Sequence, residues 1–570
     1  MAPTRLHGLF VAIAAGFVLL TNLGGPTLWD DDEPKNSACS IAMLDSGDWV
    51  VPTFNGRLRI EKPPLVNWLQ IAGAWACGRN EAGMRIGSAL LTLATCLITW
   101  RIGGLLLGPT AGLLGGLSMA TCVWTAVAGR AATPDAGLLF CTTLSIWLFV
   151  RGTPAGWRGE SFAISPLTAC GIGAACGAAM LAKGPVGLVL PLAAISGFVL
   201  WTEAAAGWRS WLTAIVRLRL PLLLAAAVVV ALPWHAWVAW RTDGEWLRGF
   251  LLVHNIGRFS GTMEGHSGSP LYYPAMIAIG FFPWSIVLLA MLAHAVAVLR
   301  GPVTDGTRRP IQLLVVWAAV WIGAFSCSGT KLPGYVWPAY PALAILCGAF
   351  LDGWLRKDTA CVSWCRDPDR ALGLVMRVAW TVLAVAGLAV AVGLPVAARL
   401  RAPGEEWLGL FGLIPLAGAV SAWRSQTSGM PARSLAAVAV SACLFVGLLA
   451  SVAADRFSRV QGMRSFTTGL DAGMDNAERS NWACYWNVPP SLVFYARSSV
   501  AKLDTPEDVA RHLGSHPRPR LLVDSRHEPQ VTDAIPPGCG VIARIPTLAD
   551  HHYVVIGPLP AEGVALVRDD

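Results

Sequence analysis

Charged residues are scarce in this chain of 570 residues, because Asp, Glu, Lys and Arg together make up only 14% of it. Soluble globular proteins carry about 25%. Apolar residues make up 54%, and this balance excludes a soluble enzyme, a disordered chain and a coiled-coil fibre. A membrane-spanning helix needs about 20 apolar residues, and the chain holds enough of them for about thirteen such helices.

Nucleotide-binding motifs are also missing. The sequence has no Walker A loop, no GxSxG turn and no HExxH zinc motif. Gly538-x-Gly540-x2-Ala543 precedes strand-like rather than helical sequence, which makes it a poor dinucleotide fingerprint. The net charge of +8 comes largely from basic residues in short loops between apolar runs, so it indicates membrane topology rather than nucleic-acid binding. We therefore expect no bound nucleotide and no nucleic-acid partner.

Hydropathy divides the first 454 residues into spans and loops. The predicted fold class is mainly α, a polytopic membrane protein with about thirteen transmembrane helices. Basic residues gather on one side of the membrane if the N-terminus lies in the cytoplasm. An odd number of spans then puts the C-terminus outside. The thirteen expected spans lie near residues 7–24, 83–100, 110–128, 135–151, 165–182, 185–201, 218–238, 271–298, 311–327, 335–351, 376–396, 407–422 and 435–453.

Hydropathy falls after Ala454, and residues 455–570 are expected to form a small soluble α/β domain outside the membrane. Residues 520–524 and 552–556 have the β-rich composition of strands. Residues 505–513 are typical of a helix, with Thr505 as its N-cap. The domain boundaries predicted are thus 1–454 for the membrane module and 455–570 for the outer domain.

Two outer loops are long, at about residues 25–82 and 241–270. The first contains apolar residues at helical spacing, which predicts an amphipathic helix. That helix either lies in the plane of the membrane interface or packs as an ordinary loop helix. The residues on its apolar stripe are Leu65, Trp68, Leu69, Ala72 and Trp75.

Most of the 14 cysteines lie inside apolar spans, where they are expected to pack as small apolar residues. Four lie on the expected outer face of the membrane. In an oxidising compartment the natural pairings are Cys39–Cys77 and Cys484–Cys539.

The first candidate site residues follow the first span. Asp32 and Glu33 end a run of four acids. Asp32 either caps a solvated helix or serves as a general base or metal ligand at the membrane surface. Further along, Glu61 precedes Lys62. Lys62 either snorkels and pairs with an acid, or holds a phosphate as a point charge.

Other ionisable residues lie where the later outer loops meet the spans. An ionisable group at that depth is costly and is a functional candidate by default. A lone His in such a loop is more often structural than a ligand. All these residues fall on one face of the membrane in a topology drawn without reference to them, which predicts an outward-facing active site. They are Asp135, Lys183, His254, Arg258, Lys331 and Tyr335.

In order along the membrane part, these motifs resemble the GT-C glycosyltransferases that use polyprenyl-phosphate sugars. The similarity is to the lipid A aminoarabinose transferases and the protein O-mannosyltransferases. The motifs that carry it are Asp32-Glu33, Ser46-Gly47-Asp48-Trp49, Glu61-Lys62-Pro63-Pro64, Asp135, Ala182-Lys183-Gly184, His254-Asn255 with Arg258-Phe259, Pro283-Trp284 and Lys331-Leu332-Pro333-x-Tyr335.

The resemblance implies a bacterial inner-membrane enzyme that transfers a sugar by an inverting displacement on the extracytoplasmic face. The donor would be a polyprenyl-phosphate sugar, and the acceptor a glycolipid, a protein or an envelope polysaccharide. It implies catalytic roles for Asp32, Glu33 and Asp135. The donor phosphate would be bound by Lys62, Lys183, Arg258, Lys331 and Tyr335. A divalent zinc, magnesium or manganese ion would be held by Glu61 and His254.

One departure concerns the sugar. Where the aminoarabinose transferases tend to have Arg-Tyr after the acidic pair, this chain has Lys35-Asn36. Two other functions stay open from the sequence. A transporter or flippase of lipid-linked saccharides would carry charges near the bilayer midplane and often repeated halves. A non-catalytic envelope assembly factor would not depend on Asp32 or Lys62.

Overall fold

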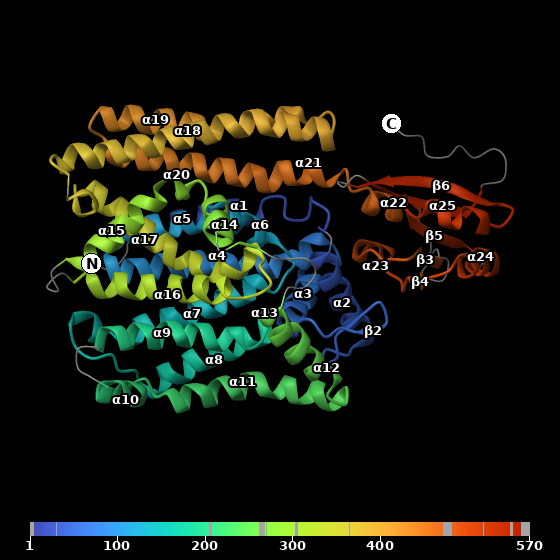
Figure 1. Ribbon diagram of the computed structural model, residues 1–570, viewed down its shortest axis with the longest axis horizontal. Helices are drawn as coiled ribbons and strands as arrows, with labels where there is room; N and C mark the ends of the chain where they lie inside the picture. Colours follow the sequence, from blue (N-terminus) through green and yellow to red (C-terminus); the bar gives the residue numbers. More distant parts are fainter. Residues whose placement is uncertain are drawn as a thin grey trace.

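The protein is an elongated bundle of helices with a small sheet domain beyond one end (Figure 1). The helices run side by side along the longest axis of the molecule. The computed structural model describes residues 5–29, 31–203, 208–261, 268–269, 271–301, 306–363, 365–470, 481–516, 518–547 and 551–559.

Among these residues, ten helices are long and apolar enough to cross a membrane. Some consist of two or three consecutive segments. The protein is therefore a multi-pass membrane protein, as its composition predicts. The ten are α4 (Glu81–Leu107), α7 (Asp135–Gly152), α8 (Pro166–Lys183), α9 (Val186–Glu203), α11 (Leu220–Arg241), α16 (Arg308–Ser326), η5 (Pro333–Ala339) with α17 (Tyr340–Leu355), α18 (Pro368–Arg401), η7 (Glu406–Gly412) with α19 (Leu413–Thr427), and α20 (Pro431–Leu448) with η8 (Leu449–Ala453) and α21 (Ala454–Ser458).

Two predicted spans are broken rather than continuous. Helices α5 (Pro109–Ala120) and α6 (Val123–Arg130) meet at a bend of 58°. Helix α14 (Tyr272–Gly280) meets the segment η4 (Trp284–Val287) and α15 (Leu288–Arg300) at 120°. Pro283 lies at the second break, and a proline cannot donate the backbone hydrogen bond that would continue the helix.

The number of spans depends on how these breaks are counted. Each bent pair taken as one span raises the number to twelve among the described residues. Helix α1 (Arg5–Leu20) is apolar but only 16 residues long. The predicted total of thirteen stays a prediction.

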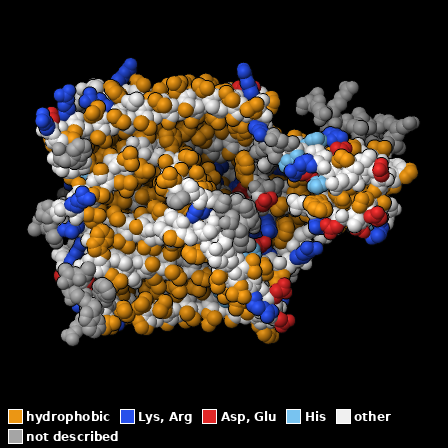
Figure 2. Space-filling model, viewed as in Figure 1, with side chains coloured by type: hydrophobic (Ala, Val, Ile, Leu, Met, Phe, Trp, Pro, Cys, Tyr) orange, Lys and Arg blue, Asp and Glu red, His pale blue; other side chains and the backbone are white. Residues whose placement is uncertain are grey.

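Small residues allow neighbouring helices to approach closely. On α8, a Cβ atom at Gly173 or Gly177 would collide with the backbone of α11 at Leu223 or Ala227. Helix–helix interfaces in membranes are enriched in such small residues, because lipid gives the helices no hydrophobic drive to associate. The glycines of this segment therefore serve helix packing. Figure 2 shows the result from outside: apolar side chains cover the flank of the bundle.

The first outer loop is fully structured, as predicted. It contains α2 (Asp32–Ser46), a hairpin of β1 (Thr53–Phe54) and β2 (Arg57–Leu58), and α3 (Leu65–Cys77). The predicted amphipathic helix is α3. Its apolar stripe is divided: Leu65 and Trp68 are half-buried against a hydrophobic cluster, whereas Ala72 and Trp75 are exposed. The exposed part is the part that can lie in the membrane interface.

The second outer loop carries α12 (Glu245–Arg248), a π-helical segment η3 (Gly249–Gly257) and α13 (Arg258–Ser260). Residues 262–267 and 270 of this loop lie outside the described part of the chain. Short helices elsewhere connect the spans: η1 (Gly156–Arg158), α10 (Trp208–Arg217) and η6 (Ala360–Val362).

The C-terminal domain is built around a five-stranded sheet in the order β4-β3-β5-β7-β6. Strands β4, β3 and β5 are parallel, and β7 and β6 are antiparallel additions. The predicted helix and both predicted strands are confirmed, and Thr505 caps α24 by accepting a hydrogen bond from the N–H of Asp508. The elements are α22 (Met463–Leu470), β3 (Asn481–Tyr485), α23 (Pro490–Ala496), β4 (Ala501–Leu503), α24 (Pro506–Ser515), β5 (Pro519–Asp524), α25 (Glu528–Val531), η10 (Thr532–Ala534), β6 (Cys539–Pro546) and β7 (His552–Pro558).

The C-terminal domain shares a hydrophobic core with the first outer loop. Ala38 on α2 and Met84 on α4 pack in one cluster with Trp482 and Leu492 of the domain. A contact from the β1–β2 hairpin also joins the C-terminal domain to the membrane part. The side chain of Asn55 donates to the carbonyl oxygen of Val500 and accepts from its N–H, both at 2.8 Å. The domain is thus docked on the membrane part by apolar and polar contacts.

The expected disulfides do not form, because all four cysteines concerned are free. Cys39 is buried on α2, whereas Cys77 is exposed at the end of α3. Cys484 lies on β3 and Cys539 on β6, with β5 and β7 between them. Their side chains also belong to hydrophobic clusters on different sides of the sheet, so the pairings Cys39–Cys77 and Cys484–Cys539 are wrong for this structure.

Candidate active site

A large polar cavity lies where the end of the bundle meets the C-terminal domain. Its volume is about 1190 Å³. Asp32 reaches it from the start of α2, Asp135 from the start of α7, and Asn487 and Lys502 from the C-terminal domain. Segments distant in the sequence therefore build one chamber, as the common membrane face of these residues predicts.

A second cavity of about 270 Å³ adjoins the first and is mostly apolar. Leu138, Leu190, Phe250 and Phe325 are among its lining residues. The two cavities share a set of side chains that is rich in charge. The shared residues are Glu61, Lys62, Lys183, Arg258 and Tyr335.

The ion pair of Asp135 and Lys183 stands at this junction. The Lys183 ammonium donates to Asp135 at 2.5 Å, with 16% and 22% of the two side chains exposed. Asp135 starts α7 and Lys183 ends α8, and a helix favours an anion at its N-terminus and a cation at its C-terminus. The ammonium also lies 5.0 Å from the centre of the Tyr335 ring. Helix ends thus hold this pair at the cavity.

Lys62 lies close to this pair. Burial and the positive charge of Lys183 lower the pKa of Lys62 to about 8, although Asp32 and Asp135 act in the opposite direction. Arg258 adds to the positive charge and lines both cavities. Three cations therefore meet where the polar and apolar cavities join, which is the arrangement that binds an anion attached to an apolar chain.

Asp32 and Glu33 are neighbours in sequence but differ completely in environment. Asp32 is exposed, lines the polar cavity and has no hydrogen-bond partner among the described residues. Asp31 occupies the N-cap position of α2, so Asp32 is the first residue of the helix rather than its cap. Its carboxylate is therefore available to a ligand.

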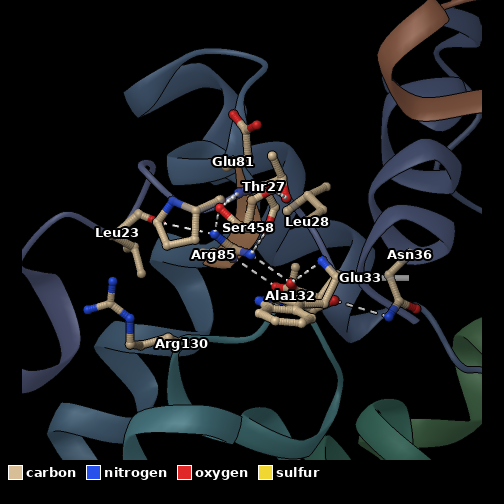
Figure 3. Close-up of polar contacts among 12 residues, drawn as sticks. Leu23, Thr27, Leu28, Glu33, Asn36, Glu81, Arg85, Arg130, Ala132 and Ser458 are labelled. Carbon is tan, nitrogen blue, oxygen red and sulfur yellow. Dashed lines mark hydrogen bonds and ion pairs between the residues drawn. The ribbon is translucent and has the colours of Figure 1, made fainter. Parts of the chain in front are cut away.

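Glu33 instead points into the protein, where it pairs with Arg85 of α4 (Figure 3). Arg85 donates to both carboxylate oxygens, at 2.8 and 2.7 Å, and the N–H groups of Trp29 and Ala132 donate as well. Burial raises the pKa of Glu33, but Arg85 and the two N–H groups outweigh it and hold the pKa below its usual range. Glu33 lines neither cavity, so its contacts are with the protein itself, and its predicted catalytic role stays a prediction.

Glu61 is engaged by two cations, Lys35 at 2.7 Å and Arg59 at 3.0 Å. Burial opposes ionisation, but Arg59 and Lys35 prevail and lower the pKa of Glu61 to about 2. His254, its predicted partner on a metal ion, lines the apolar cavity. Within the described ranges, no group of three or more His, Cys, Asp and Glu side chains could hold a metal ion. The metal site of Glu61 and His254 stays a prediction, and no step is assigned to a metal.

Lys331 also departs from its predicted role. It is buried outside the lining of both cavities, and its ammonium donates to the carbonyl oxygens of Ser326 and Ser328 at 2.8 and 3.0 Å. Its contacts hold the turn before η5, which carries Tyr335 to the cavities.

The prediction missed two contributors. Arg85 carries a recognisable signal, an ionisable residue inside an apolar run. Lys502 carries none, because it reaches the cavity only through the docking of the C-terminal domain.

Comparison with known proteins supports a common origin for this arrangement. Residues 61–237 match the family model of the dolichyl-phosphate-mannose-protein mannosyltransferases. An undecaprenyl phosphate-alpha-4-amino-4-deoxy-L-arabinose arabinosyl transferase of Pseudomonas aeruginosa is 30% identical over 440 residues, which are 77% of this chain and 74% of that protein. A relative of the same name from Edwardsiella ictaluri is 30% identical over 354 residues, 61% of this chain and 60% of its own length.

The fold also matches a solved structure. The crystal structure of ArnT from Cupriavidus metallidurans bound to undecaprenyl phosphate superimposes with a TM-score of 0.76 at 22% identity, covering 96% of this chain and 97% of that one. The protein is an integral-membrane glycosyltransferase of the GT-C class that depends on a polyprenyl-phosphate sugar. Its helical bundle, its C-terminal domain and its paired cavities agree with this class. The chain belongs to the family of the undecaprenyl phosphate-alpha-4-amino-4-deoxy-L-arabinose arabinosyl transferases. The predicted resemblance is confirmed.

Proposed function

We propose that this protein transfers an aminopentose from undecaprenyl phosphate to a glycolipid of the lipid A type on the extracytoplasmic face of the bacterial inner membrane. The observation that carries the proposal is the cluster of Lys62, Lys183 and Arg258 where an apolar cavity joins a polar one. A polyprenyl phosphate has the matching chemistry, an apolar chain ending in an anion. The names of the relatives supply the sugar and the lipid carrier.

In the proposed complex, the first part of the lipid chain occupies the apolar cavity. The phosphate lies against Lys62, Lys183 and Arg258, which stabilise the negative charge that develops as the phosphate leaves. The sugar then projects into the polar cavity, where Asp32 and the acceptor meet it. No nucleotide site is needed, because the donor arrives already attached to a lipid phosphate.

The proposed reaction is a single displacement. An acceptor oxygen attacks the anomeric carbon and gives its proton to Asp32, while the bond from that carbon to the phosphate oxygen breaks and its electron pair leaves with the lipid phosphate. Asp135 holds Lys183 in place and lies close enough to orient the acceptor. A single displacement inverts the anomeric centre, so a covalent sugar–enzyme adduct would contradict it.

The orientation follows from charge. Lys and Arg predominate at the end of the bundle far from the sheet domain (Figure 2), and loops rich in Lys and Arg stay in the cytoplasm. This supports a cytoplasmic N-terminus and an extracytoplasmic C-terminal domain. Cysteine-accessibility labelling of intact cells tests it, in a background where the exposed Cys77 and Cys327 are replaced by serine. A cysteine at Asp504 is expected to react with an impermeant reagent and one at Arg424 is not.

The test of the reaction compares lipids from cells with and without the gene by mass spectrometry. Loss of one aminopentose mass from a glycolipid is expected. Loss of the sugar from a glycoprotein or a polysaccharide would instead identify one of the other acceptors and overturn the glycolipid. A transporter would change the distribution of the lipid-linked sugar without transferring it to any acceptor in vitro.

Complementation with variants tests the residues. Asp32→Asn should reduce transfer by roughly 10²–10⁴-fold, the usual contribution of a positioned base. Asp45→Asn is the matched control, because Asp45 is an exposed acid of the same helix that pairs with Arg79 at the surface. Wild-type transfer by Asp32→Asn would remove Asp32 from the mechanism, and a non-catalytic assembly factor predicts that result.

A further inference from the structure

A third cavity, of about 560 Å³, lies within the C-terminal domain and away from the cation cluster. Its floor is formed by the ends of two parallel strands, β3 and β5. After β3 the chain continues to β4 on one side, and after β5 it continues to β6 and β7 on the other. In open α/β sheets, ligands bind outside the carboxyl ends of the strands where the strand order reverses in this way.

An aromatic platform forms one wall of this cavity. Trp486 follows β3 directly, and 57% of its surface is exposed. Its ring stacks on His527, with ring centres 5.6 Å apart. Large aromatic side chains are normally buried, so an exposed tryptophan at the mouth of a cavity is a candidate contact for a ligand.

The backbone conformation at Trp486 is strained. The N–H of Asn487 donates to the carbonyl oxygen of Tyr485 at 2.9 Å, which closes a three-residue turn around Trp486. Trp486 has a φ of 72°, in the left-handed region that disfavours a bulky side chain. Such strain is typical of residues that contact ligands.

Polar groups surround the platform. Arg526 binds Asp524 through two side-chain hydrogen bonds, at 2.9 and 2.6 Å, and these bonds lower the pKa of Asp524 to about 2. The carboxylate is therefore an acceptor at any physiological pH, and the exposed guanidinium has N–H groups to spare. Nδ1 of His527 is buried and has no hydrogen-bond partner within the part of the chain that the structure describes, and a buried polar atom of this kind normally has one.

The chemistry of the cavity distinguishes among ligands. At this position in dinucleotide-binding folds, the phosphates lie on backbone N–H groups that a glycine-rich loop presents at a helix N-terminus. Here the turn into α23 contains Pro489 and Pro490, which have no N–H. A pyranose fits better, because its C–H face packs on an aromatic ring and its hydroxyl groups bond with a carboxylate, a guanidinium and an imidazole.

The position of the cavity suggests where the saccharide comes from. Asn487 lines both this cavity and the polar cavity of the active site. Asn487 therefore stands between the two cavities, and a ligand that reaches from one to the other would pass it.

We propose that the cavity between β3 and β5 binds a saccharide through Trp486, Asp524 and Arg526, and that this saccharide is the sugar portion of the acceptor beyond the group that is glycosylated. The first half of the proposal is independent of the reaction, whereas the second rests on the proposed function.

The binding half is tested by calorimetric titration of the full-length protein in detergent. The probe is the water-soluble oligosaccharide obtained by deacylating the envelope glycolipid of the source organism. Wild-type protein is expected to bind it, Trp486→Ala to bind about tenfold more weakly, as loss of an aromatic contact predicts, and Trp486→Phe to bind within about threefold of wild type. Arg511→Ala, an exposed change on α24 outside the cavity, should bind like wild type. Absence of wild-type binding, or equal binding by Trp486→Ala, overturns the proposal.

The acceptor half is tested by transfer kinetics with the intact glycolipid. Trp486→Ala should raise KM for the acceptor and leave kcat and KM for the donor near wild type. An unchanged acceptor KM overturns the assignment to the acceptor. Lys62→Ala separates the two ideas, because it should still bind the oligosaccharide while losing transfer. If the wild-type protein binds the oligosaccharide through Trp486 but transfers no sugar to the glycolipid, the proposed function is wrong and the saccharide site still stands.

Discussion

The two buried ion pairs near the outer end of the bundle differ in what surrounds them. Glu33 and Arg85 are each 5% exposed, and every carboxylate oxygen accepts from both a guanidinium and a backbone N–H. Asp135 and Lys183 have about four times that exposure, and they face a cavity. The first pair has no capacity left for a ligand, and the second does. Unused hydrogen-bonding capacity beside a cavity, rather than charge alone, therefore separates the pair that we propose acts in the reaction from the pair that is enclosed by the protein.

The largest effect on stability is expected at the ion pair of Glu33 and Arg85. Glu33→Ala leaves Arg85 buried beside an empty space, and breaking a buried pair from one side costs about 3–5 kcal/mol. We expect a marked fall in the thermal unfolding temperature of the purified protein, together with reduced yield. The comparison breaks down if Glu33→Ala keeps wild-type stability and loses only activity.

Variants of the ion pair of Asp135 and Lys183 should lose activity and keep their stability. Lys183→Met removes one of the cations that face the donor phosphate, and loss of one such contact reduces kcat by roughly 10²–10³-fold. Its unfolding temperature should stay close to wild type. Asp135→Asn and the double variant Asp135→Asn/Lys183→Met complete a double-mutant cycle. The fall in kcat of the double variant should be smaller than the product of the two single falls, because the two groups act together. Independent, multiplicative losses would show that the pair does not act as a unit.

The cation cluster also predicts a pH dependence. The pKa of Lys62 is about 8, below that of an ordinary lysine, so its charge is lost as the pH rises through 8. Because the donor phosphate binds the protonated form, kcat/KM for the donor should fall above about pH 8, by up to about tenfold per pH unit. In Lys62→Arg the guanidinium stays charged, and this alkaline decrease should move to higher pH. The same decrease in both proteins would assign it to another group.

The smallest effect is expected at the hairpin that docks the outer domain. Asn55→Ala removes both bonds to Val500, and each hydrogen bond contributes about 1 kcal/mol. Hydrogen exchange of the backbone around residues 500–503 should become faster, while exchange in the bundle should not change. Uniformly faster exchange would indicate that the junction is part of one cooperative unit with the bundle.

Much of this arrangement could be predicted from the sequence because its signals are local. Apolar runs predict the bundle, and the topology brings Asp32, Lys62, Asp135 and Lys183 to one face. Both broken segments are expected as continuous spans because their composition is apolar throughout. Pro283 does mark the break between α14 and η4, whereas no proline marks the break between α5 and α6.

Glu33 and Lys331 lie outside both cavity linings because of contacts that their motifs do not show. The place of Glu33 is decided by Arg85, 52 residues later. Lys331 is occupied by carbonyl groups that only the folded turn brings near it. The disulfide prediction likewise required the strand order, which no spacing between cysteines contains.

The core that α2 and α4 share with Trp482 and Leu492 has a consequence for engineering and for evolution. The outer domain is not a detachable module. Deleting it would expose an apolar surface of the membrane part to water. A chimera that takes this domain from a relative must also take the relative's α2 and α4. Changes in acceptor preference that act through this domain are therefore expected to arise together with compensating substitutions in α2 and α4.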